Sequence, residues 1–327
     1  MLLDTSVGTS NMGDFIIMEC VRKELAPLLE NNFVYNLPTH LPAFNGLAVW
    51  KNSLSVRRYA ECDLKFAGGS NLLCKNLLTH YPQWNISPFN SRPLKGVITV
   101  GVGAGRGKNS DVNFFTKWLY KRILNREFYH SVRDERSKLF VESLGLKAIN
   151  TGCVTMWMLT PEFCQTIPTK KSDRVVFTLT AKALDAPADE RDQAMIDILK
   201  RNYNELNFWV QGDEDMLYFA KFKNTDGIRI IPPRKEAYDA LLTNNDIDYV
   251  GTRLHGGIYA MRHRRRAIII AIDERAAAIN KSNHLNCLRR KDVPEQLEAM
   301  VQSEFNTDIK MDFDAILRWK AQFGGKF

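Results

Sequence analysis

Short β-rich runs alternate with amphipathic stretches along most of the 327 residues. This alternation is typical of βαβ units, in which helices connect the parallel strands of a sheet. The runs expected to form strands are 62–67, 97–102, 127–132, 174–180, 207–211, 228–231, 247–251 and 267–272. Because one domain usually has roughly 100–200 residues, the chain length and this pattern predict an α/β fold with two doubly wound domains.

A proline-containing polar segment separates the strand-like runs into two groups. Residues 156–173 include Pro161 and Pro168 and end in Thr-Lys-Lys-Ser-Asp. We therefore expect a first Rossmann-like domain at 1–155, a linker at 156–173 and a second Rossmann-like domain at 174–327. Two such domains that face each other place a cleft at the carboxyl ends of both sheets, where ligands of doubly wound folds bind.

Amphipathic helices are expected near both ends of the chain. In the first, apolar residues recur at spacings of four, four and three, at Ile17, Val21, Leu25 and Leu28. These spacings place the four side chains on one helical face. The segment 311–327 repeats apolar residues in a similar way, which predicts a packing helix that is free to cross back onto the first domain.

The composition is that of a globular protein with an excess of positive charge. The 45 Lys and Arg residues exceed the 37 Asp and Glu residues by 8, which favours an anionic partner such as nucleic acid, a phosphorylated metabolite or an acidic membrane. No apolar run approaches the roughly 18–20 residues of a membrane span. The first residues lack the pattern of a signal peptide, so we expect a cytoplasmic location. The six cysteines form no CxxC pair and do not cluster with histidines, so neither disulfides nor a metal site are expected.

The first motif is Gly-Thr-Ser-Asn-Met-Gly-Asp at 8–14, directly before a predicted helix. Backbone N–H groups at a helix N-terminus can bind an anion, so Asn11 and Gly13 are candidates for a phosphate or acceptor loop. The alternative is a tight turn in which Asn11 or Asp14 caps the helix.

Two further glycine-rich turns follow predicted strands, at 68–69 and 101–108. The second lacks the residues of a Walker A or a GxGxxG motif, and it carries Arg106 and Lys108. Gly69 and Gly103 are therefore candidates for a phosphate or acceptor loop, while an ordinary surface loop explains the sequence equally well.

Arg133 lies where a predicted strand enters a helix, within His-Ser-Val-Arg-Asp-Glu. At the carboxyl edge of a sheet this arginine would face the cleft. A salt bridge with a neighbouring acid is the alternative interpretation.

The most informative motif is Tyr-Val-Gly-Thr-Arg-Leu-His-Gly-Gly at 249–257. An apolar strand ends in Gly-Thr, and the two final glycines begin a helix. Arg253 and His255 therefore lie two residues apart on one turn and can face one ligand. Arginine offers a planar fork for a carboxylate or phosphate, and histidine can move protons near neutral pH.

The densest basic run is Arg-His-Arg-Arg-Arg at 262–266. A solvated turn and contact with anionic lipid headgroups are the two interpretations. Nucleic-acid binding is not expected, because no helix-turn-helix, RNA-recognition or zinc-finger pattern accompanies the run.

In their order and spacing, several segments resemble the polysaccharide pyruvyl transferase family. They are 8–14, 68–69, 101–105, 131–135 with 144–145, and 251–256 with 268–273. The resemblance implies two Rossmann-like domains arranged as in GT-B glycosyltransferases, with the acceptor on the N-terminal side. It also implies that an enolpyruvyl-derived group moves from phosphoenolpyruvate to sugar hydroxyls of a surface polysaccharide unit, often lipid-linked, and forms a pyruvate ketal.

The family motifs also imply roles for particular residues. The Arg-Leu-His motif falls on Arg253, Leu254 and His255, and the Val-Arg-Asp motif falls on Arg133, so donor binding carries over to Arg253, Leu254 and Arg133. His255 is the expected proton carrier, and Asp14 is a possible acid or acceptor-binding group. This sequence has Gly-Thr where the family commonly has Ser before the arginine, which leaves the choice of acceptor open.

Phosphoenolpyruvate carries a carboxylate and a phosphate, so it needs at least two cationic groups such as Arg253 and Arg133. No cofactor is expected beyond this co-substrate. The expected partners are a glycan acceptor and the anionic inner face of a membrane, without nucleic acid. The alternatives are a GT-B glycosyltransferase that uses a nucleotide sugar and a non-enzymatic protein that binds an anionic ligand.

Overall fold

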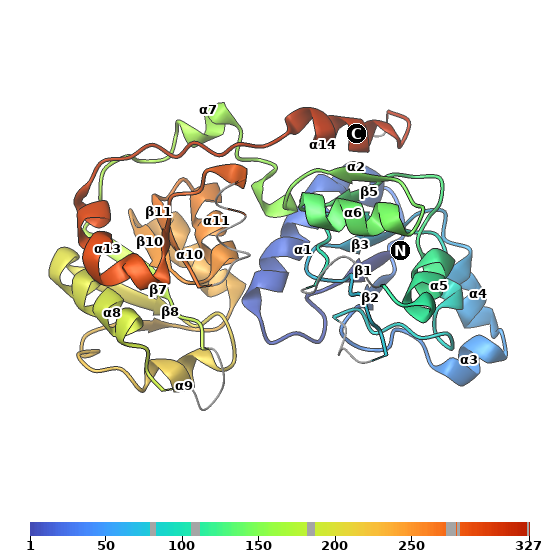
Figure 1. The fold of residues 1–327 in the computed structure, drawn as a ribbon, viewed down its shortest axis with the longest axis horizontal. Helices are drawn as coiled ribbons and strands as arrows, with labels where there is room; N and C mark the ends of the chain where they lie inside the picture. Colours follow the sequence, from blue (N-terminus) through green and yellow to red (C-terminus); the bar gives the residue numbers. More distant parts are fainter. Residues whose placement is uncertain (79–82, 106–111, 182–186, 273–278, 280–281, 326) are drawn as a thin grey trace. The chain divides into compact units, whose positions relative to one another are not determined.

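The computed structural model describes residues 1–327 except 79–82, 106–111, 182–186, 273–278, 280–281 and 326 (Figure 1). Arg106, Lys108 and Asp273, which the sequence singled out, therefore lie outside the described residues. The chain forms two compact units. Unit 1 comprises residues 1–9, 17–157 and 312–327, and unit 2 comprises 10–16 and 158–311. The units thus exchange short segments, unlike the continuous domains at 1–155 and 174–327 that the sequence suggested.

Unit 1 is built on parallel strands. They are β1 (Leu2–Asp4), β2 (Asn36–Pro38), β3 (Lys65–Gly68), β4 (Val97–Val100), β5 (His130–Val132) and β6 (Ala148–Asn150). The first four form a sheet in the order β2-β1-β3-β4, and β5 pairs with β6. A parallel bridge between Val102 and Val132, with a hydrogen bond of 2.9 Å from Thr99 Oγ1 to Ser131 O, places β5 beside β4. The order reverses between β1 and β3, which is the switch point of this sheet.

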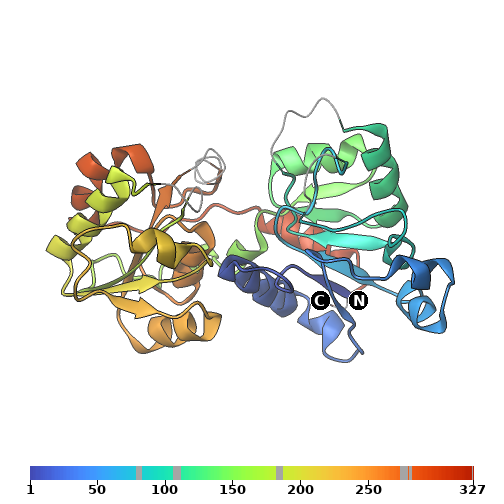
Figure 2. The same ribbon diagram turned by 90° about the horizontal axis from the view of Figure 1, so that it is seen from below.

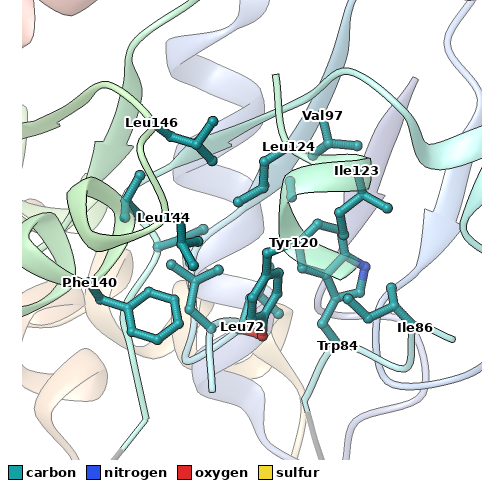
Figure 3. Close-up of a cluster of buried hydrophobic side chains, with 14 of the residues drawn as sticks. Leu72, Trp84, Ile86, Val97, Tyr120, Ile123, Leu124, Phe140, Leu144 and Leu146 are labelled. Atoms are coloured by element: carbon teal, nitrogen blue, oxygen red, sulfur yellow. The ribbon is translucent and has the colours of Figure 1, made fainter. Parts of the chain in front are cut away.

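Helices cover both faces of the unit 1 sheet. They are α1 (Met12–Glu24), α2 (Ala26–Leu29), α3 (Gly46–Trp50), α4 (Leu54–Ala60), α5 (Phe114–Ile123), α6 (Glu135–Ser143) and α14 (Phe313–Ala321), with 3-10 turns at Arg92–Leu94 and Val154–Met156. The predicted stripe of Ile17, Val21, Leu25 and Leu28 is buried. Helices α5 and α6 pack on the opposite face, where Tyr120 and Phe140 meet Leu72, Trp84 and Leu144 in the core shown in Figure 3.

The C-terminal helix α14 belongs to unit 1. Trp319 is fully buried, and its ring nitrogen donates a hydrogen bond of 2.9 Å to Tyr129 O. Phe323 packs edge-on against Phe66 of β3, with the ring centroids 5.5 Å apart. The helix therefore completes the face of the sheet that α1 covers only in part.

Unit 2 has a six-stranded sheet in which all the described pairings are parallel. The strands are β7 (Arg174–Thr178), β8 (Glu205–Trp209), β9 (Arg229–Ile231), β10 (Asp248–Gly251), β11 (Ala267–Ala271) and β12 (Cys287–Arg289). The sheet order is β12-β11-β10-β7-β8-β9, which is the order of a Rossmann fold. The predicted α/β class with doubly wound parallel sheets is confirmed.

The helices of unit 2 lie on both faces of this sheet (Figures 1 and 2). They are α7 (Pro161–Cys164), α8 (Glu190–Asn202), α9 (Asp215–Phe219), α10 (Lys235–Asn244), α11 (Leu254–Arg262) and α13 (Val293–Gln302), with a 3-10 turn at Arg290–Asp292. Helices α8, α9 and α13 share one apolar core with the sheet. On the other face, Trp209 of β8 stacks on Tyr238 of α10 at 3.8 Å between ring centroids. Among the described residues, no helix combines the length and the apolar character that crossing a membrane requires.

Candidate functional site

The switch point of the unit 2 sheet lies between β7 and β10. The chain builds outward from β7 through β8 to β9 and then returns to β10 on the other side. Ligands of doubly wound folds bind at the carboxyl ends of the two strands that flank such a reversal. Here β7 ends at Thr178 and β10 ends at Gly251, and Arg253 follows two residues later. The topology thus places the predicted arginine at the usual ligand position of the fold.

Three hydrogen bonds fix the turn that presents Arg253. The Arg253 backbone N–H donates to Thr178 Oγ1 at 3.2 Å, and the Tyr249 hydroxyl donates to Arg253 O at 2.7 Å. The Thr178 and Tyr249 hydroxyls are themselves 2.6 Å apart. Burial raises the pKa of Tyr249 well above its usual range, so this hydroxyl stays protonated. The backbone at position 253 is therefore held from both sides.

The Arg253 guanidinium is held by Asp215, a residue that the sequence analysis did not single out. Arg253 Nε donates to Leu179 O at 3.2 Å, and Nη2 forms a short ion pair with Asp215 Oδ1. Asp215 is fully buried, and its Oδ2 accepts from the backbone N–H groups of Gln211 at 3.1 Å and Gly212 at 2.8 Å. Burial raises the pKa of this carboxyl, and the charge of Arg253 opposes that rise. The side chain of Arg253 keeps 19% of its surface exposed, so the oriented cation remains accessible to a ligand.

Gly212 makes room for this arginine. A Cβ at position 212 would lie 2.7 Å from Arg253 Nη2, so any larger residue would push the guanidinium away. The segment Gln211-Gly212-Asp213-Glu214-Asp215 begins two residues after the end of β8 and leads into α9. An acid shortly after a glycine at a strand end was the sequence signal that could have revealed Asp215.

The N-terminal motif joins the same network. Asn11 Oδ1 accepts from Gly13 N at 3.0 Å and from Gln211 Nε2 at 3.2 Å, and Met12 N donates to Gln211 O at 2.8 Å. The interpretation of Asn11 as a helix cap is thus confirmed. Residues 10–16 belong to unit 2, although the sequence analysis assigned them to a first domain at 1–155. Segments 200 residues apart in the chain therefore meet within a single unit.

The first turn of α11 completes this candidate site. Arg253 is the N-cap position of the helix, and Leu254 and His255 are its first two residues, both half-buried. The positive end of the helix dipole favours an anion at this turn. The carbonyl of Gly256 accepts from Tyr238 at 2.9 Å, which anchors the turn to α10. The site thus combines an oriented cation, a helix N-terminus and an adjacent histidine.

Asp14, the remaining candidate of the N-terminal motif, and Gln211, which the sequence analysis did not single out, are both buried. Asp14 is buried near the start of α1, and its backbone N–H donates to Asn11 O at 3.0 Å. Gln211 is also buried, and its Oε1 has no hydrogen-bond partner among the described residues. Among all the residues that the structure describes, no group of three or more His, Cys, Asp or Glu side chains is placed to hold a metal ion.

Arg133 occupies a different site, in unit 1. Its side chain is only 6% exposed, Nη2 donates to Asn71 Oδ1, and Nε lies 3.4 Å from Asp134 Oδ2. A Cβ on Gly103 would lie 2.4 Å from the Arg133 guanidinium carbon, so the arginine rests directly on this glycine. Arg133 therefore lies at the carboxyl edge of the unit 1 sheet, as expected, and it also has the acidic neighbour of the alternative interpretation.

The two candidate glycines of unit 1 have structural roles. The N–H of Gly69 donates to Val100 O at 2.8 Å, and that of Gly103 donates to Ser70 O at 2.8 Å. A Cβ on Gly69 would lie 1.9 Å from Ile17 Cγ2, so α1 can pack here only against glycine. Backbone pairing and close packing account for both residues, and their place in a phosphate loop stays a prediction.

The basic run at 262–266 is not the solvent-exposed cluster that contact with lipid headgroups would need. Arg266 is 1% exposed and donates to Asp248 Oδ2 at 2.8 Å and to Val301 O, at the end of α13, at 2.9 Å. Arg262 is also buried. The expected lipid-binding patch is therefore wrong at these two positions, because the sequence could not show that Arg262 and Arg266 are buried or that Arg266 lies against the end of α13.

Comparisons with solved structures support the fold class. A UDP-GlcNAc 2-epimerase from Methanocaldococcus jannaschii matches with a TM-score of 0.51 and 11% identity, over 94% of this chain and 96% of that chain. The Staphylococcus aureus MnaA–UDP structure matches with a TM-score of 0.49 and 10% identity, over 96% of this chain and 95% of that chain. At such identities the first likeness shows the GT-B-like α/β fold alone. The comparison with curated proteins gave no match. The model of a family described as polysaccharide pyruvyl transferase matches residues 11–274.

Proposed function

The chain belongs to the polysaccharide pyruvyl transferase family, and we propose that it transfers the enolpyruvyl-derived group of phosphoenolpyruvate to two hydroxyls of one sugar. The product is a cyclic pyruvate ketal on a surface polysaccharide unit, and phosphate is released. The donor binds to unit 2 at Arg253 and the first turn of α11. The acceptor sugar binds to unit 1.

The orientation of Arg253 is the observation that supports this proposal most directly. The guanidinium lies at the switch point of a Rossmann sheet, and Asp215 and Leu179 O fix its plane. A fixed guanidinium fork matches a carboxylate or phosphate in two-point geometry, and phosphoenolpyruvate carries both groups. The helix N-terminus beside it adds further N–H donors for the same anion.

The reaction needs two proton transfers, and the residues present can serve them. Protonation of the methylene carbon makes the central carbon electrophilic, and a sugar oxygen bonds to that carbon. The bond from the central carbon to the phosphate oxygen then breaks, and a second sugar oxygen closes the ring. The two sugar hydroxyls lose two protons in total. One balances the proton that the methylene carbon takes up to become a methyl group, and the other leaves with the phosphate. We assign one of these transfers to His255, which lies two residues from Arg253, and we keep Asp14 as a second candidate.

Two variants separate donor binding from proton transfer. Arg253→Lys keeps the charge but loses the fork, so we expect the affinity for phosphoenolpyruvate to fall about ten- to a hundredfold. His255→Gln should leave donor binding largely intact while turnover falls about 10²–10⁴-fold. The matched controls are Arg265→Lys, whose Nε also donates to a carbonyl, and His263→Gln at the other end of α11.

Donor binding is measured by calorimetry, and the product is identified by mass spectrometry of the acceptor. A gain of one pyruvate with loss of water supports the proposal. A gain of one hexose from a nucleotide sugar would instead show a glycosyltransferase. Anion binding without any turnover would show a binding protein. A folded His255→Gln variant with normal turnover would contradict the role of this histidine.

A further inference from the structure

The positive charge of the chain is concentrated in residues 31–126. This stretch has 13 Lys and Arg residues and 3 Asp and Glu residues, a net charge of +10, whereas the whole chain carries +8. The rest of the chain is therefore slightly acidic. Lys51, Arg57, Arg58 and Arg92 in this stretch are exposed. The whole of this cationic stretch belongs to unit 1.

Large apolar side chains are exposed in the same stretch. Of the 17 such side chains that are exposed in the described residues, nine lie between 31 and 126. Leu47, Trp50 and Leu54 are 68%, 79% and 67% exposed, and Phe89 is 76% exposed. Exposed apolar side chains that gather into one patch mark an interaction surface, whereas isolated ones need no explanation.

Leu47, Trp50 and Leu54 come from two short neighbouring helices, α3 and α4 (Figures 1 and 2), and Phe89 lies in the segment before the 3-10 turn at Arg92–Leu94. Leu47 and Trp50 are three residues apart on α3, so they share a face. On α4, Leu54 shares a face with Arg57 and Arg58 for the same reason. The opposite faces of the two helices carry the buried residues Val49 and Val56.

One contact joins α4 to the turn that follows α3, and a second places Phe89 beside the start of α3. Arg57 Nε donates to Asn52 O at 3.1 Å, in the turn between α3 and α4. The Cβ of Phe89 lies 3.3 Å from the position that a Cβ on Gly46 would take, at the start of α3. We call Leu47, Trp50, Leu54 and Phe89, with Lys51, Arg57 and Arg58, the α3–α4 surface.

We propose that the α3–α4 surface binds the headgroup region of an anionic phospholipid bilayer. Tryptophan and leucine beside arginine and lysine are the residues that insert at a membrane interface and attract anionic headgroups. A polar polyanion such as RNA would match the charges but would leave Leu47 and Leu54 without an apolar environment. This inference does not depend on the proposed reaction, and it replaces the basic run at 262–266 as the contact with lipid.

Vesicle co-sedimentation of the whole protein tests the charge requirement. We expect binding to vesicles of phosphatidylcholine mixed with phosphatidylglycerol, weaker binding at higher salt, and little binding to phosphatidylcholine alone. Each basic residue near an anionic surface contributes about a fivefold gain in affinity, so Arg57→Gln with Arg58→Gln should bind about 25-fold more weakly. The matched control is Leu317→Ser with Arg229→Gln, at exposed positions elsewhere, which should bind as the unchanged protein does.

Fluorescence tests the apolar contact at the same time. Trp50 is the most exposed tryptophan, so brominated lipids should quench its emission when the protein binds vesicles. In Trp50→Phe this quenching should largely disappear while binding persists, and Trp50→Ser should bind about tenfold more weakly. Equal binding to neutral vesicles, unchanged binding of the double arginine variant, or binding of polyuridylate without binding of vesicles would each overturn the proposal.

Discussion

Asp215→Asn is the sharpest test of how the candidate donor site is built. The asparagine has nearly the same size, and its Oδ1 can keep the two hydrogen bonds from Gln211 N and Gly212 N. Its amide Nδ2 would then face Arg253 Nη2, so that one donor meets another. The change therefore removes the charge that orients Arg253 without opening a cavity.

The expected magnitude follows from the burial of the pair. Removal of one partner from a buried ion pair typically costs about 3–5 kcal/mol. Arg253 keeps 19% of its side chain exposed, so water can solvate part of the unpaired charge, and we expect a loss of about 2–3 kcal/mol in the free energy of unfolding. Because the guanidinium also leaves its fixed plane, the affinity for phosphoenolpyruvate should fall about tenfold, or about 1.4 kcal/mol.

Asp248→Asn is the matched control. Asp248 is also a buried aspartate of unit 2 paired with an arginine, Arg266, but it lies at the first residue of β10, at the opposite edge of the sheet. Urea unfolding should show that both variants are destabilised, and Asp248→Asn by the larger amount, about 3–5 kcal/mol, because Arg266 is only 1% exposed. Calorimetry with phosphoenolpyruvate should show a loss of affinity in Asp215→Asn alone. Equal donor affinity in two folded variants would refute the assignment of Asp215 as the residue that positions Arg253.

Three further predictions concern unit 1. Gly103→Ala should displace the Arg133 guanidinium and lower the rate of phosphate release about tenfold. Gly105→Ala is the control, because its Cβ makes only ordinary contacts, and it should leave the rate unchanged. Equal rates in the two variants would show that phosphate release does not depend on the position of Arg133. Burial holds the pKa of His130 at about 4, below its ordinary 6.5. The contribution of this shift to the free energy of unfolding is therefore fully present above pH 6.5, and about 3 kcal/mol is lost as the pH falls toward 4. Urea unfolding at several pH values should show this loss, and a His130→Gln variant with the same pH dependence would contradict it. Trp319→Ala should lower the free energy of unfolding by about 3–5 kcal/mol in the same assay, and a near-neutral effect would show that α14 does not complete unit 1.

The sequence predicted those elements whose signal is local. The run at 267–272 became β11, where all five side chains are buried, and such a strand is recognisable from its composition alone. The strands β1, β2, β6 and β12 were missed; each has three residues, which is too short for a period to appear, and β5 and β9 of the same length were found only within longer predicted runs. Their positions in the sheets depend on pairing with strands far away in the chain.

The local part of the candidate site was predictable from the sequence, and its long-range contacts were not. The motif around Arg253 and His255 showed that a strand ends and a helix begins there, and the structure has β10 ending at Gly251 and α11 beginning at Leu254. The partner of the arginine could not be predicted, because Asp215 lies 38 residues earlier and nothing local links the two. The contact between Asn11 and Gln211 spans 200 residues and exists only in the folded chain.

The exchange of segments between the units has a consequence for biosynthesis. During translation, residues 10–16 are made long before Gln211, so the N-terminal motif cannot form its hydrogen bonds to Gln211 until residues 158–211 of unit 2 have been synthesised. Likewise, the face of the unit 1 sheet that Trp319 and Phe323 cover stays open until the whole of 158–311 has been made. Contacts of such long range form slowly, and apolar faces left open meanwhile are prone to aggregate. A nascent chain of this protein is therefore a natural client for chaperones that shield hydrophobic surface, until the last helix is in place.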